Sequence, residues 1–245
     1  MKKDDYQHHI SQQFNAELET LRTHLMEMGG LVEKQLADAI VSLVDSDSGV
    51  AAEVLRMEPK INALEVTIDE ECQRILAKRQ PAASDLRLII AVTKCTSDLE
   101  RIGDESAKIA KMAINLAEEG ASPKGYVEVR HIGSLVRAMV HDTLDAFARF
   151  DAEKGIAVAR KDKEVDVEYK SAMRALVTFM MEDPRSISRI LSVMWSLRAL
   201  ERIGDHARNV SEQVIYLVKG KDVRHRPLDE IEEHVVKPGS GGLTR

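Results

Sequence analysis

The sequence carries one hexapeptide twice, as Leu99-Glu100-Arg101-Ile102-Gly103-Asp104 and as Leu200-Glu201-Arg202-Ile203-Gly204-Asp205. The two copies are 101 positions apart, and chance repetition of six residues, letter for letter, is improbable in a chain of 245 residues. Self-similarity at a long fixed offset indicates a duplicated structural unit. The sequence therefore predicts two copies of one fold, with the hexapeptide at the equivalent place in each.

Apolar residues around the hexapeptide keep the spacing of a helix-bundle seam in both copies. The steps are three, seven, four and three residues, which place the side chains on one face of a helix. The residues are Leu99, Ile102, Ile109, Ala113 and Leu116 in the first copy, and Leu200, Ile203, Val210, Val214 and Leu217 in the second. Each hexapeptide therefore belongs to a long helix, which we take as the third of its unit.

Proline-containing turns precede both of these helices, at 80–84 and at 182–186. Proline is compatible with a helix start but not with a helix interior. Further upstream, apolar residues in steps of four and three run from Phe14 to Leu43 and predict one long first helix. Gly29-Gly30 interrupts this helix at a cost on the order of 1 kcal/mol per glycine, which a packed apolar stripe offsets.

The remaining turns and helices complete the two units. A polar cluster at 45–49 predicts a turn or helix cap, followed by a second helix over about 50–78. The Gly- and Pro-containing stretch 118–125 separates the copies. The second copy then shows helical patterns through 132–147 and over about 162–181.

The fold prediction is therefore all-α, with two tandem, pseudo-symmetric three-helix bundles and six long helices. The first repeat takes residues 1–120 and the second takes 121–220. The Gly-rich end of the chain predicts a mobile C-terminal tail over 221–245.

Composition agrees with a soluble helical protein and excludes several functional classes. The chain is 44% apolar, 31% charged and only 4% aromatic, with a formal net charge of -6. A negative net charge argues against a basic nucleic-acid-binding surface.

No apolar run is long enough to cross a bilayer, and the start lacks the apolar segment of a signal peptide, so we expect a cytoplasmic protein without direct membrane insertion. Cys72 and Cys95 make no CxxC pair and are expected to be reduced core thiols.

The hexapeptide places two carboxylates on one helix face in each copy. At about 100° per residue, Glu100 and Asp104 lie within roughly 40° of each other, and Glu201 and Asp205 do the same. The apolar residues of the hexapeptide face the seam, whereas the carboxylates are displaced from it. Like charges at this spacing mildly destabilise a helix, so we expect compensation by Arg or Lys residues or by a cation.

A second acidic pattern lies on the predicted middle helix of the second copy, at Asp162 and Asp166. At an offset of 104 its counterpart in the first copy is Glu58 and Asn62, a weaker match because Asn62 is uncharged. Two helices of one unit would then present acidic ladders to a shared surface. Carboxylates without thiolates and with few imidazoles suit hard cations such as Mg²⁺, Mn²⁺ or iron.

Other interpretations of these residues remain open at this stage. Arg101 or Arg202 can instead pair with a carboxylate of a neighbouring helix, and acidic residues on a solvated face need no further explanation. The mid-helix Gly103 and Gly204 favour close approach of another helix or of a ligand, since each costs about 1 kcal/mol against Ala. We expect His206 to be an exposed histidine outside the acidic site.

The chain resembles the PhoU family over roughly residues 7–220. Four stretches carry this resemblance: 80–87 leading to 98–104, and 200–209 leading to 215–217. The resemblance implies the paired three-helix bundle and a surface E(D)xxxD motif that carries multinuclear metal clusters. The motif falls on Glu100, Asp104, Glu201, Asp205, Asp162 and Asp166, with Glu58 and Asn62 as a degenerate match.

The resemblance also implies a function and partners. Members of the family repress the phosphate-starvation response when phosphate is plentiful. They link the phosphate ABC transporter, through its ATPase subunit PstB, to the sensor histidine kinase PhoR, and are commonly homodimers. The implied location is the cytoplasm, in peripheral association with membrane complexes through these partners.

Two rival functions follow from the same residues. One is a carboxylate-bridged dimetal enzyme, but such bundles usually contain two Glu-x-x-His motifs, and the sequence offers only Glu128-Val129-Arg130-His131. Neither a GxxxxGK[ST] loop nor a GxSxG motif occurs, so we expect no enzyme. The other rival is a helical scaffold that shares the adaptor function without depending on metal.

Overall fold

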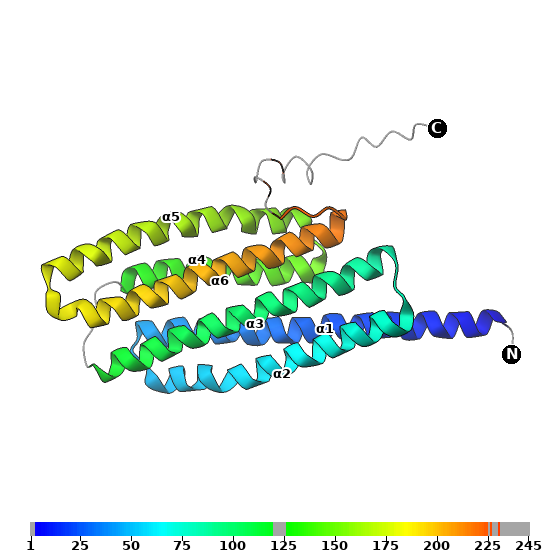
Figure 1. Ribbon diagram of the computed structural model, residues 1–245, viewed down its shortest axis with the longest axis horizontal. Helices are drawn as coiled ribbons and strands as arrows, with labels where there is room; N and C mark the ends of the chain where they lie inside the picture. The colour runs from blue at the N-terminus through cyan, green and yellow to red at the C-terminus, as the bar shows by residue number, and fades with distance from the viewer. Residues whose placement is uncertain (1–2, 120–125, 225, 227–229, 231–245) are drawn as a thin grey trace.

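The computed structural model describes residues 3–119, 126–224, 226 and 230. In these ranges the chain forms six long α-helices and one short 3-10 helix, and no strand (Figure 1). The all-α prediction is therefore confirmed. The predicted boundary between the copies falls mainly on 120–125, which lies outside the described residues, as does most of the predicted tail.

The first repeat consists of α1 (Lys3–Val44), α2 (Ser48–Arg79) and α3 (Ala83–Glu118). Gly29 and Gly30 lie inside α1, so the predicted single first helix is confirmed. Asp47 caps α2, because its carboxylate accepts the backbone N–H groups of Gly49 at 2.9 Å and Val50 at 3.0 Å. The polar cluster at 45–49 is thus a turn and a helix cap together.

The second repeat consists of α4 (Tyr126–Arg149), α5 (Ala152–Glu182), the 3-10 helix η1 (Pro184–Ser186) and α6 (Ile187–Lys219). The sequence pattern placed the start of α5 near Asp162, ten residues too late. The helix begins where Asp151 accepts the backbone N–H of Lys154 at 3.0 Å. The prediction was wrong here because three of the buried residues in the first turns of α5, namely Ala152, Gly155 and Ala159, are small and add little to the hydrophobic periodicity.

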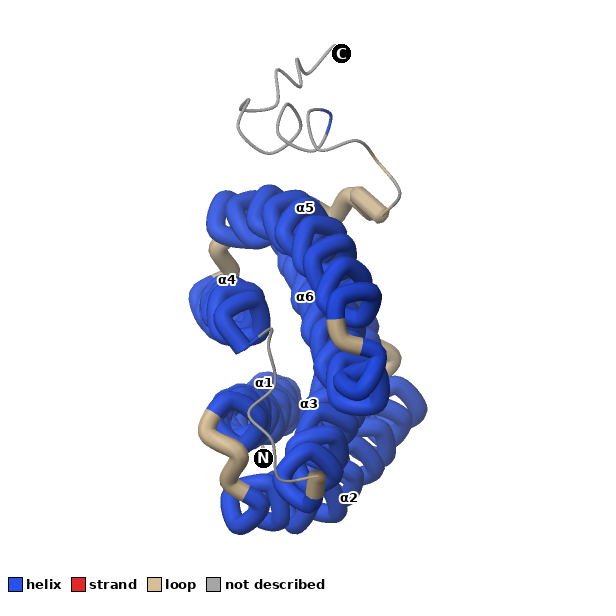
Figure 2. The backbone as a smooth tube through the Cα atoms, turned by 90° about the vertical axis from the view of Figure 1, so that its left-hand side faces the viewer, coloured by secondary structure: helices blue, strands red, loops and turns tan. Residues whose placement is uncertain are grey.

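The two three-helix bundles share one long contact. Figure 2, which looks along the helices, shows α3 and α6 adjacent to each other, with α2 and α5 at the outer ends and α1 facing α4. The most extensive helix–helix contact of the described chain joins α3 to α6, and α1 also packs against α4. The third helix of each repeat therefore lies in the middle of the molecule.

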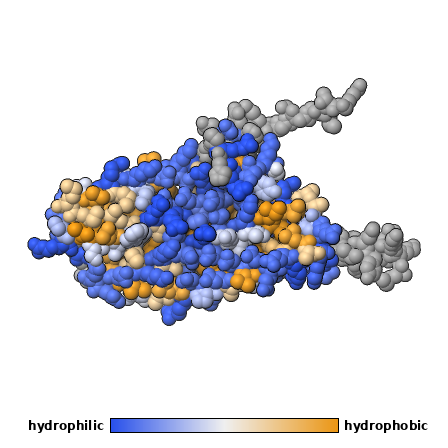
Figure 3. Space-filling view, viewed as in Figure 1, coloured by the Kyte–Doolittle hydropathy of each residue, from blue (hydrophilic) through white to orange (hydrophobic). Residues whose placement is uncertain are grey.

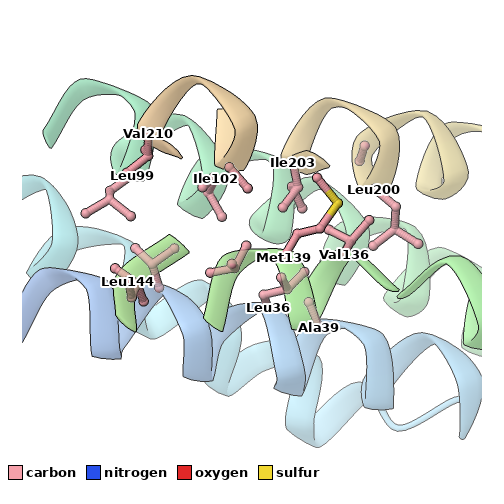
Figure 4. Packing of buried hydrophobic residues seen from close by; sticks show 14 of the residues in the cluster. Leu36, Ala39, Leu99, Ile102, Val136, Met139, Leu144, Leu200, Ile203 and Val210 are labelled. Atoms are coloured by element: carbon pink, nitrogen blue, oxygen red, sulfur yellow. The ribbon is translucent and has the colours of Figure 1, made fainter. Parts of the chain in front are cut away.

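A single hydrophobic cluster runs through both repeats. Figure 4 shows its central part, where side chains of α1, α3, α4 and α6 meet. The labelled residues are Leu36, Ala39, Leu99, Ile102, Val136, Met139, Leu144, Leu200, Ile203 and Val210. The division into units 1–120 and 121–220 stays a prediction, and the buried core is continuous between them.

The close approach of α1 and α4 explains why position 29 of α1 is a glycine. A Cβ atom at Gly29 would lie 2.4 Å from Cδ2 of Leu144, so the absence of a side chain makes room for α4. Gly133 of α4 in turn makes room for Ile40 of α1, since a Cβ at Gly133 would lie 3.1 Å from Cδ1 of Ile40. Packing between the repeats thus offsets the low helix propensity of Gly29.

Residues 221–224, the start of the predicted tail, lie in the described part of the chain. Gly220 ends α6 in the left-handed conformation, with φ 68°. Beyond it, Val223 is only 2% exposed and packs with Ala152, Ile156 and Ile215. The boundary of the predicted mobile tail at 221 is therefore wrong for Val223, which is part of a small cluster at the start of α5.

Removing a side chain from the inter-repeat core should destabilise the whole fold. Ile203 is fully buried between the repeats, and we expect Ile203→Ala to lower the free energy of unfolding by about 2–5 kcal/mol, because it leaves a cavity. Denaturant unfolding followed by circular dichroism measures this loss. Val167→Ala, at a site 64% exposed, is the control and should change stability by about 0.5 kcal/mol or less. Equal effects of the two changes would contradict a shared core.

An ion pair between α1 and α2 makes stability depend on pH. Glu17 accepts two hydrogen bonds from Arg79, both 2.8 Å long, and these bonds lower the pKa of Glu17 from its usual 4.5 although partial burial opposes them. A lowered pKa in the folded protein gives stability that is present above pH 4.5 and is lost as the pH falls through the lowered value.

We therefore expect Glu17→Gln to lower the unfolding free energy at neutral pH, and the difference from the wild type to vanish in acid. Urea unfolding at a series of pH values measures it. A difference that stays constant down to acid pH would show that the charge of Glu17 is not responsible.

Candidate functional site with two acidic faces

The acidic residues predicted for the second repeat come together between α5 and α6. We call Asp162, Asp166, Glu201 and Asp205 the second acidic face. Burial raises the pKa of Glu201, and the negative charges of Asp205, Asp166 and Asp162 raise it further, although Arg198 opposes them. The pKa of Asp205 is also raised, by burial and then by Asp166. In the structure, the carboxylates of α5 and α6 therefore lie close enough for their charges to interact.

Asp162 is the buried member of this face. Its side chain is 7% exposed, and its Oδ2 accepts a hydrogen bond of 3.1 Å from Nη1 of Arg208. Burial raises the pKa of Asp162, whereas the hydrogen bond to Arg208 lowers it. The expectation that Asp162 points outward with the other acids is wrong, because Arg208 of α6 holds it inside.

Glu201 has one oxygen with a partner and one without. Its Oε1 accepts a hydrogen bond of 2.8 Å from Arg198, while its Oε2 is buried without a hydrogen-bond partner among the described residues. An unsatisfied buried carboxylate oxygen is costly. Such an atom is the kind that a cation would satisfy.

The first acidic face differs from the prediction in its α2 residues. Burial raises the pKa of Glu100, and Asp104, Glu65 and Glu58 raise it further in that order, against the opposing charge of Arg101. Glu65 has a raised pKa for similar reasons, from burial, Asp69 and Asp104. The first acidic face therefore consists of Glu65 and Asp69 on α2 with Glu100 and Asp104 on α3.

Glu65 and Asp69 were not predicted from the sequence, because the offset of 104 pairs Asp162 and Asp166 with Glu58 and Asn62. Asn62, which was predicted instead, is exposed, and Glu58 contributes only the smallest of the effects on Glu100. The signal was present, since an offset of 101 maps Asp166 onto Glu65, and Glu65-xxx-Asp69 is itself an ExxxD pattern.

The repeated glycines fix this alignment. A Cβ at Gly103 would lie 3.1 Å from Oε1 of Gln35 on α1 and 3.5 Å from Cδ1 of Ile61 on α2. A Cβ at Gly204 would lie 3.8 Å from both Oδ1 of Asp162 on α5 and Cε of Met139 on α4. Each glycine thus lies against the first and middle helices of its own repeat, and Ile61 is the structural counterpart of Asp162. The glycines admit a neighbouring helix, which was one of the two alternatives predicted for them.

Polar contacts between α3 and α6 lie beside both faces. Nη1 of Arg202 is 2.9 Å from Oε1 of Glu105, whose side chain is only 4% exposed. Nδ1 of His206 lies 2.8 Å from Oδ1 of Asp98. The prediction that His206 is exposed is therefore wrong, since its side chain is 14% exposed and the carboxylate of the other repeat covers it.

A hollow of about 470 Å³ opens next to Asp205. Arginines contribute much of its wall, but each of them is paired with a carboxylate: Arg202 with Glu105, Arg208 with Asp162 and Glu212, and Arg224 with Asp222. Because the positive charges are neutralised in this way, the hollow offers no preformed anion site.

The other candidates from the sequence lie apart from the acidic faces. Nε2 of His131 is 3.9 Å from Oε2 of Glu168, and both side chains are about half exposed, so the single Glu-x-x-His motif does not point into a core. Both cysteines are buried and unbonded. Burial raises the pKa of the Cys72 thiol, and also that of Cys95.

The described ranges also contain neither a preformed metal-binding group nor a membrane-spanning helix. No three Asp, Glu, His or Cys side chains there form a group that is ready to hold a metal ion. None of the described helices has an apolar stretch that is long enough to span a bilayer.

Comparison with known proteins assigns the chain to a family. The PhoU domain model matches residues 25–113 and 129–214. The chain is 64% identical to the phosphate-specific transport system accessory protein PhoU homolog of Pseudomonas aeruginosa, over 96% of this chain and 97% of that one. It is 46% identical to the protein of the corresponding name from Escherichia coli K12, over 92% and 93% of the two chains.

Solved structures agree with this assignment. The crystal structure of PhoU from Pseudomonas aeruginosa superposes with a TM-score of 0.84 at 65% identity, covering 85% of this chain and all of that one. The structure of the phosphate transport system regulatory protein PhoU from Streptococcus pneumoniae gives a TM-score of 0.78 at 31% identity, covering 86% and 99%. With both repeats matched in sequence and in fold, the chain belongs to the PhoU family.

Proposed function

We propose that this protein is an accessory regulator of phosphate uptake that represses the phosphate-starvation response when phosphate is plentiful. The observation that carries the proposal is the full-length match to proteins named as accessory proteins of the phosphate-specific transport system. The matched region includes both hexapeptides and both acidic faces, so the elements that would serve this function are all present.

As a regulator, the protein would act as an adaptor between two membrane complexes. Its partners would be PstB, the ATPase subunit of the phosphate transporter, and the sensor histidine kinase PhoR. It would work as a homodimer in the cytoplasm, associated with the membrane through these partners. The two acidic faces support this proposal, because the carboxylates that remain accessible on them, such as Asp205 and Asp166, offer a charged docking surface between two packed helices.

The acidic faces also fit the chemistry of a hard divalent or multinuclear metal such as Mg²⁺, Mn²⁺ or iron. The donors are carboxylate oxygens from two helices, and the buried Oε2 of Glu201 has no hydrogen-bond partner in the described part of the chain. Glu100, Asp104, Glu65 and Asp69 would hold a metal on the first face, and Glu201, Asp205 and Asp166 on the second. A bound cation would neutralise these charges. The side chains must move closer together to bind it, since none of the described acids forms a ready group of three.

Repulsion within the faces makes a prediction for the metal-free protein. Glu100→Gln removes one charge from the first face, and we expect it to raise the unfolding free energy at neutral pH by roughly 0.2–0.5 kcal/mol, because a like-charge pair at this spacing is unfavourable. Urea unfolding in the presence of a chelator measures the gain. Glu164→Gln, at an exposed position of α5, is the control.

With Mn²⁺ added, the order should reverse, because a ligand that binds only the folded state stabilises the wild type more than the variant. A wild type that gains nothing from Mg²⁺, Mn²⁺ or Fe²⁺ would support the metal-independent scaffold instead.

The proposed function itself is tested in cells that lack this protein. A reporter gene under a phosphate-starvation promoter should be active at high phosphate and repressed again by the wild-type protein. The fourfold variant Glu100→Gln, Asp104→Asn, Glu201→Gln, Asp205→Asn should fail to repress it and should recover less PstB and PhoR from membranes in a pull-down.

The matched control changes four exposed glutamates outside the faces to glutamine: Glu19, Glu53, Glu164 and Glu182. It should repress like the wild type. Full repression by the fourfold variant, with its helix content intact by circular dichroism, would exclude the acidic faces from function. A wild type that does not repress would overturn the proposed function as a whole.

A further inference from the structure

The reversal between α5 and α6 exposes large apolar side chains, including the only tryptophan of the chain. Trp195 is 65% exposed and Met181 is 79% exposed. We call the apolar tip the set of Val177 and Met181 on α5 with Ile187, Leu191 and Trp195 on α6, all of which are exposed. Figure 3 shows apolar residues gathered at the end of the molecule where Figure 1 places this reversal.

The spacing of these residues makes them one surface. On α6 they recur at every fourth position, so they form a stripe along one side of the helix, and on α5 the two residues are also four apart. The core in this stretch takes other residues, namely Ile190, Val193 and Leu197, which are at most 2% exposed. The apolar tip is therefore not needed to close the bundle.

Two arginines with no described ion-pair partner lie beside the apolar tip, among acids. Residues 184–200 contain Arg185, Arg189 and Arg198 but no Asp or Glu, in a chain whose net charge is -6. Arg198 pairs with Glu201, whereas no described side chain forms an ion pair with Arg185 or Arg189. The acids nearby are Glu182 and Asp183, which follow Met181 in the chain, and Glu119 of α3, which accepts a hydrogen bond of 3.1 Å from Ser188.

The equivalent end of the first repeat shares this character only in part. At the offset of 101, Val177 corresponds to Leu76, which is 40% exposed. Ile187 and Leu191 correspond to Leu86 and Ile90, which are only partly exposed. Trp195 and Met181, the two most exposed members of the apolar tip, correspond instead to Lys94 and Gln80. The exposed tryptophan and methionine therefore distinguish this end of the second repeat from the equivalent end of the first.

We propose that the apolar tip docks on an anionic lipid surface. Tryptophan is favoured at the level of lipid headgroups because its ring is apolar and its N–H is polar. Arginines next to it would contact lipid phosphates. The apolar tip projects from a helix reversal at one end of an elongated molecule (Figure 1), which suits a broad flat partner better than a single peptide.

This contact would be peripheral and would turn one end of the protein toward the membrane. It stands apart from the proposed metal binding, since no member of the apolar tip belongs to either acidic face. It would add a direct attachment to the association through partner proteins proposed above.

The single tryptophan makes the test specific to this site. Purified protein is titrated with vesicles of phosphatidylglycerol and phosphatidylcholine, and separately with vesicles of phosphatidylcholine alone. We expect the Trp195 emission to shift to shorter wavelength, and the protein to sediment with the vesicles, only when phosphatidylglycerol is present. Salt should weaken the binding, because the arginine contribution is electrostatic.

Two variants separate charge from apolar contact. Arg185→Glu with Arg189→Glu should raise the lipid concentration for half-maximal shift by about thirtyfold or more, from the loss of two near-surface cations. Leu191→Asp should abolish the shift while circular dichroism shows an unchanged helix content. The matched control, Arg74→Glu with Lys78→Glu at the opposite end of the molecule, should bind like the wild type.

Three outcomes would overturn the proposal. One is the absence of an emission shift with phosphatidylglycerol vesicles. Another is a shift that follows protein concentration without lipid and accompanies a doubled molecular mass, which would assign the apolar tip to self-association. The third is a shift with cell membranes that pure lipids do not reproduce, which would assign it to a protein partner.

Discussion

The long apolar contact between α3 and α6 is the constraint on which the rest of the structure depends. Leu99, Ile102, Leu200 and Ile203 are at most 1% exposed, so the rotation of both helices about their axes is fixed. With the apolar positions of each hexapeptide turned inward, its Glu and Asp must emerge on the side where the middle helix lies. The position of the acidic faces thus follows from hydrophobic packing. The free energy gained by burying the apolar side chains of α3 and α6 offsets the repulsion between the carboxylates.

Sequence patterns predicted the helices, the turns and the hexapeptide acids, because all of these depend on local periodicity and capping. The patterns failed where a partner comes from another helix. Nothing local reveals that Arg208 draws Asp162 inward or that Asp98 covers His206. The start of α5 was missed because small residues such as Gly155 are also common in loops. In the structure this glycine packs closely against α6, since a Cβ added to it would lie 3.1 Å from the backbone oxygen of Ser211.

The two acidic faces are similar in plan and different in chemistry. In the second repeat a buried Asp162 with its arginine lies beneath the face, whereas Ile61 occupies that position in the first repeat. In return the first face has Asp69, where the second has Lys170, a lysine whose Nζ lies 4.0 Å from Asp166. The repeated hexapeptide gives the two faces a common geometry, and the residues that differ between the repeats give each face its own charge.

The ion pair between Arg202 and Glu105 ties these faces together mechanically. Arg202 directly follows Glu201 in the chain, and Glu105 directly follows Asp104, so this bridge joins the backbone beside one acidic pair to the backbone beside the other. Sliding of either central helix along its axis would have to break the bridge. The ion pair therefore helps to hold the two acidic faces at a constant distance from each other. A partner that contacts both faces would meet the same distance between them each time it binds.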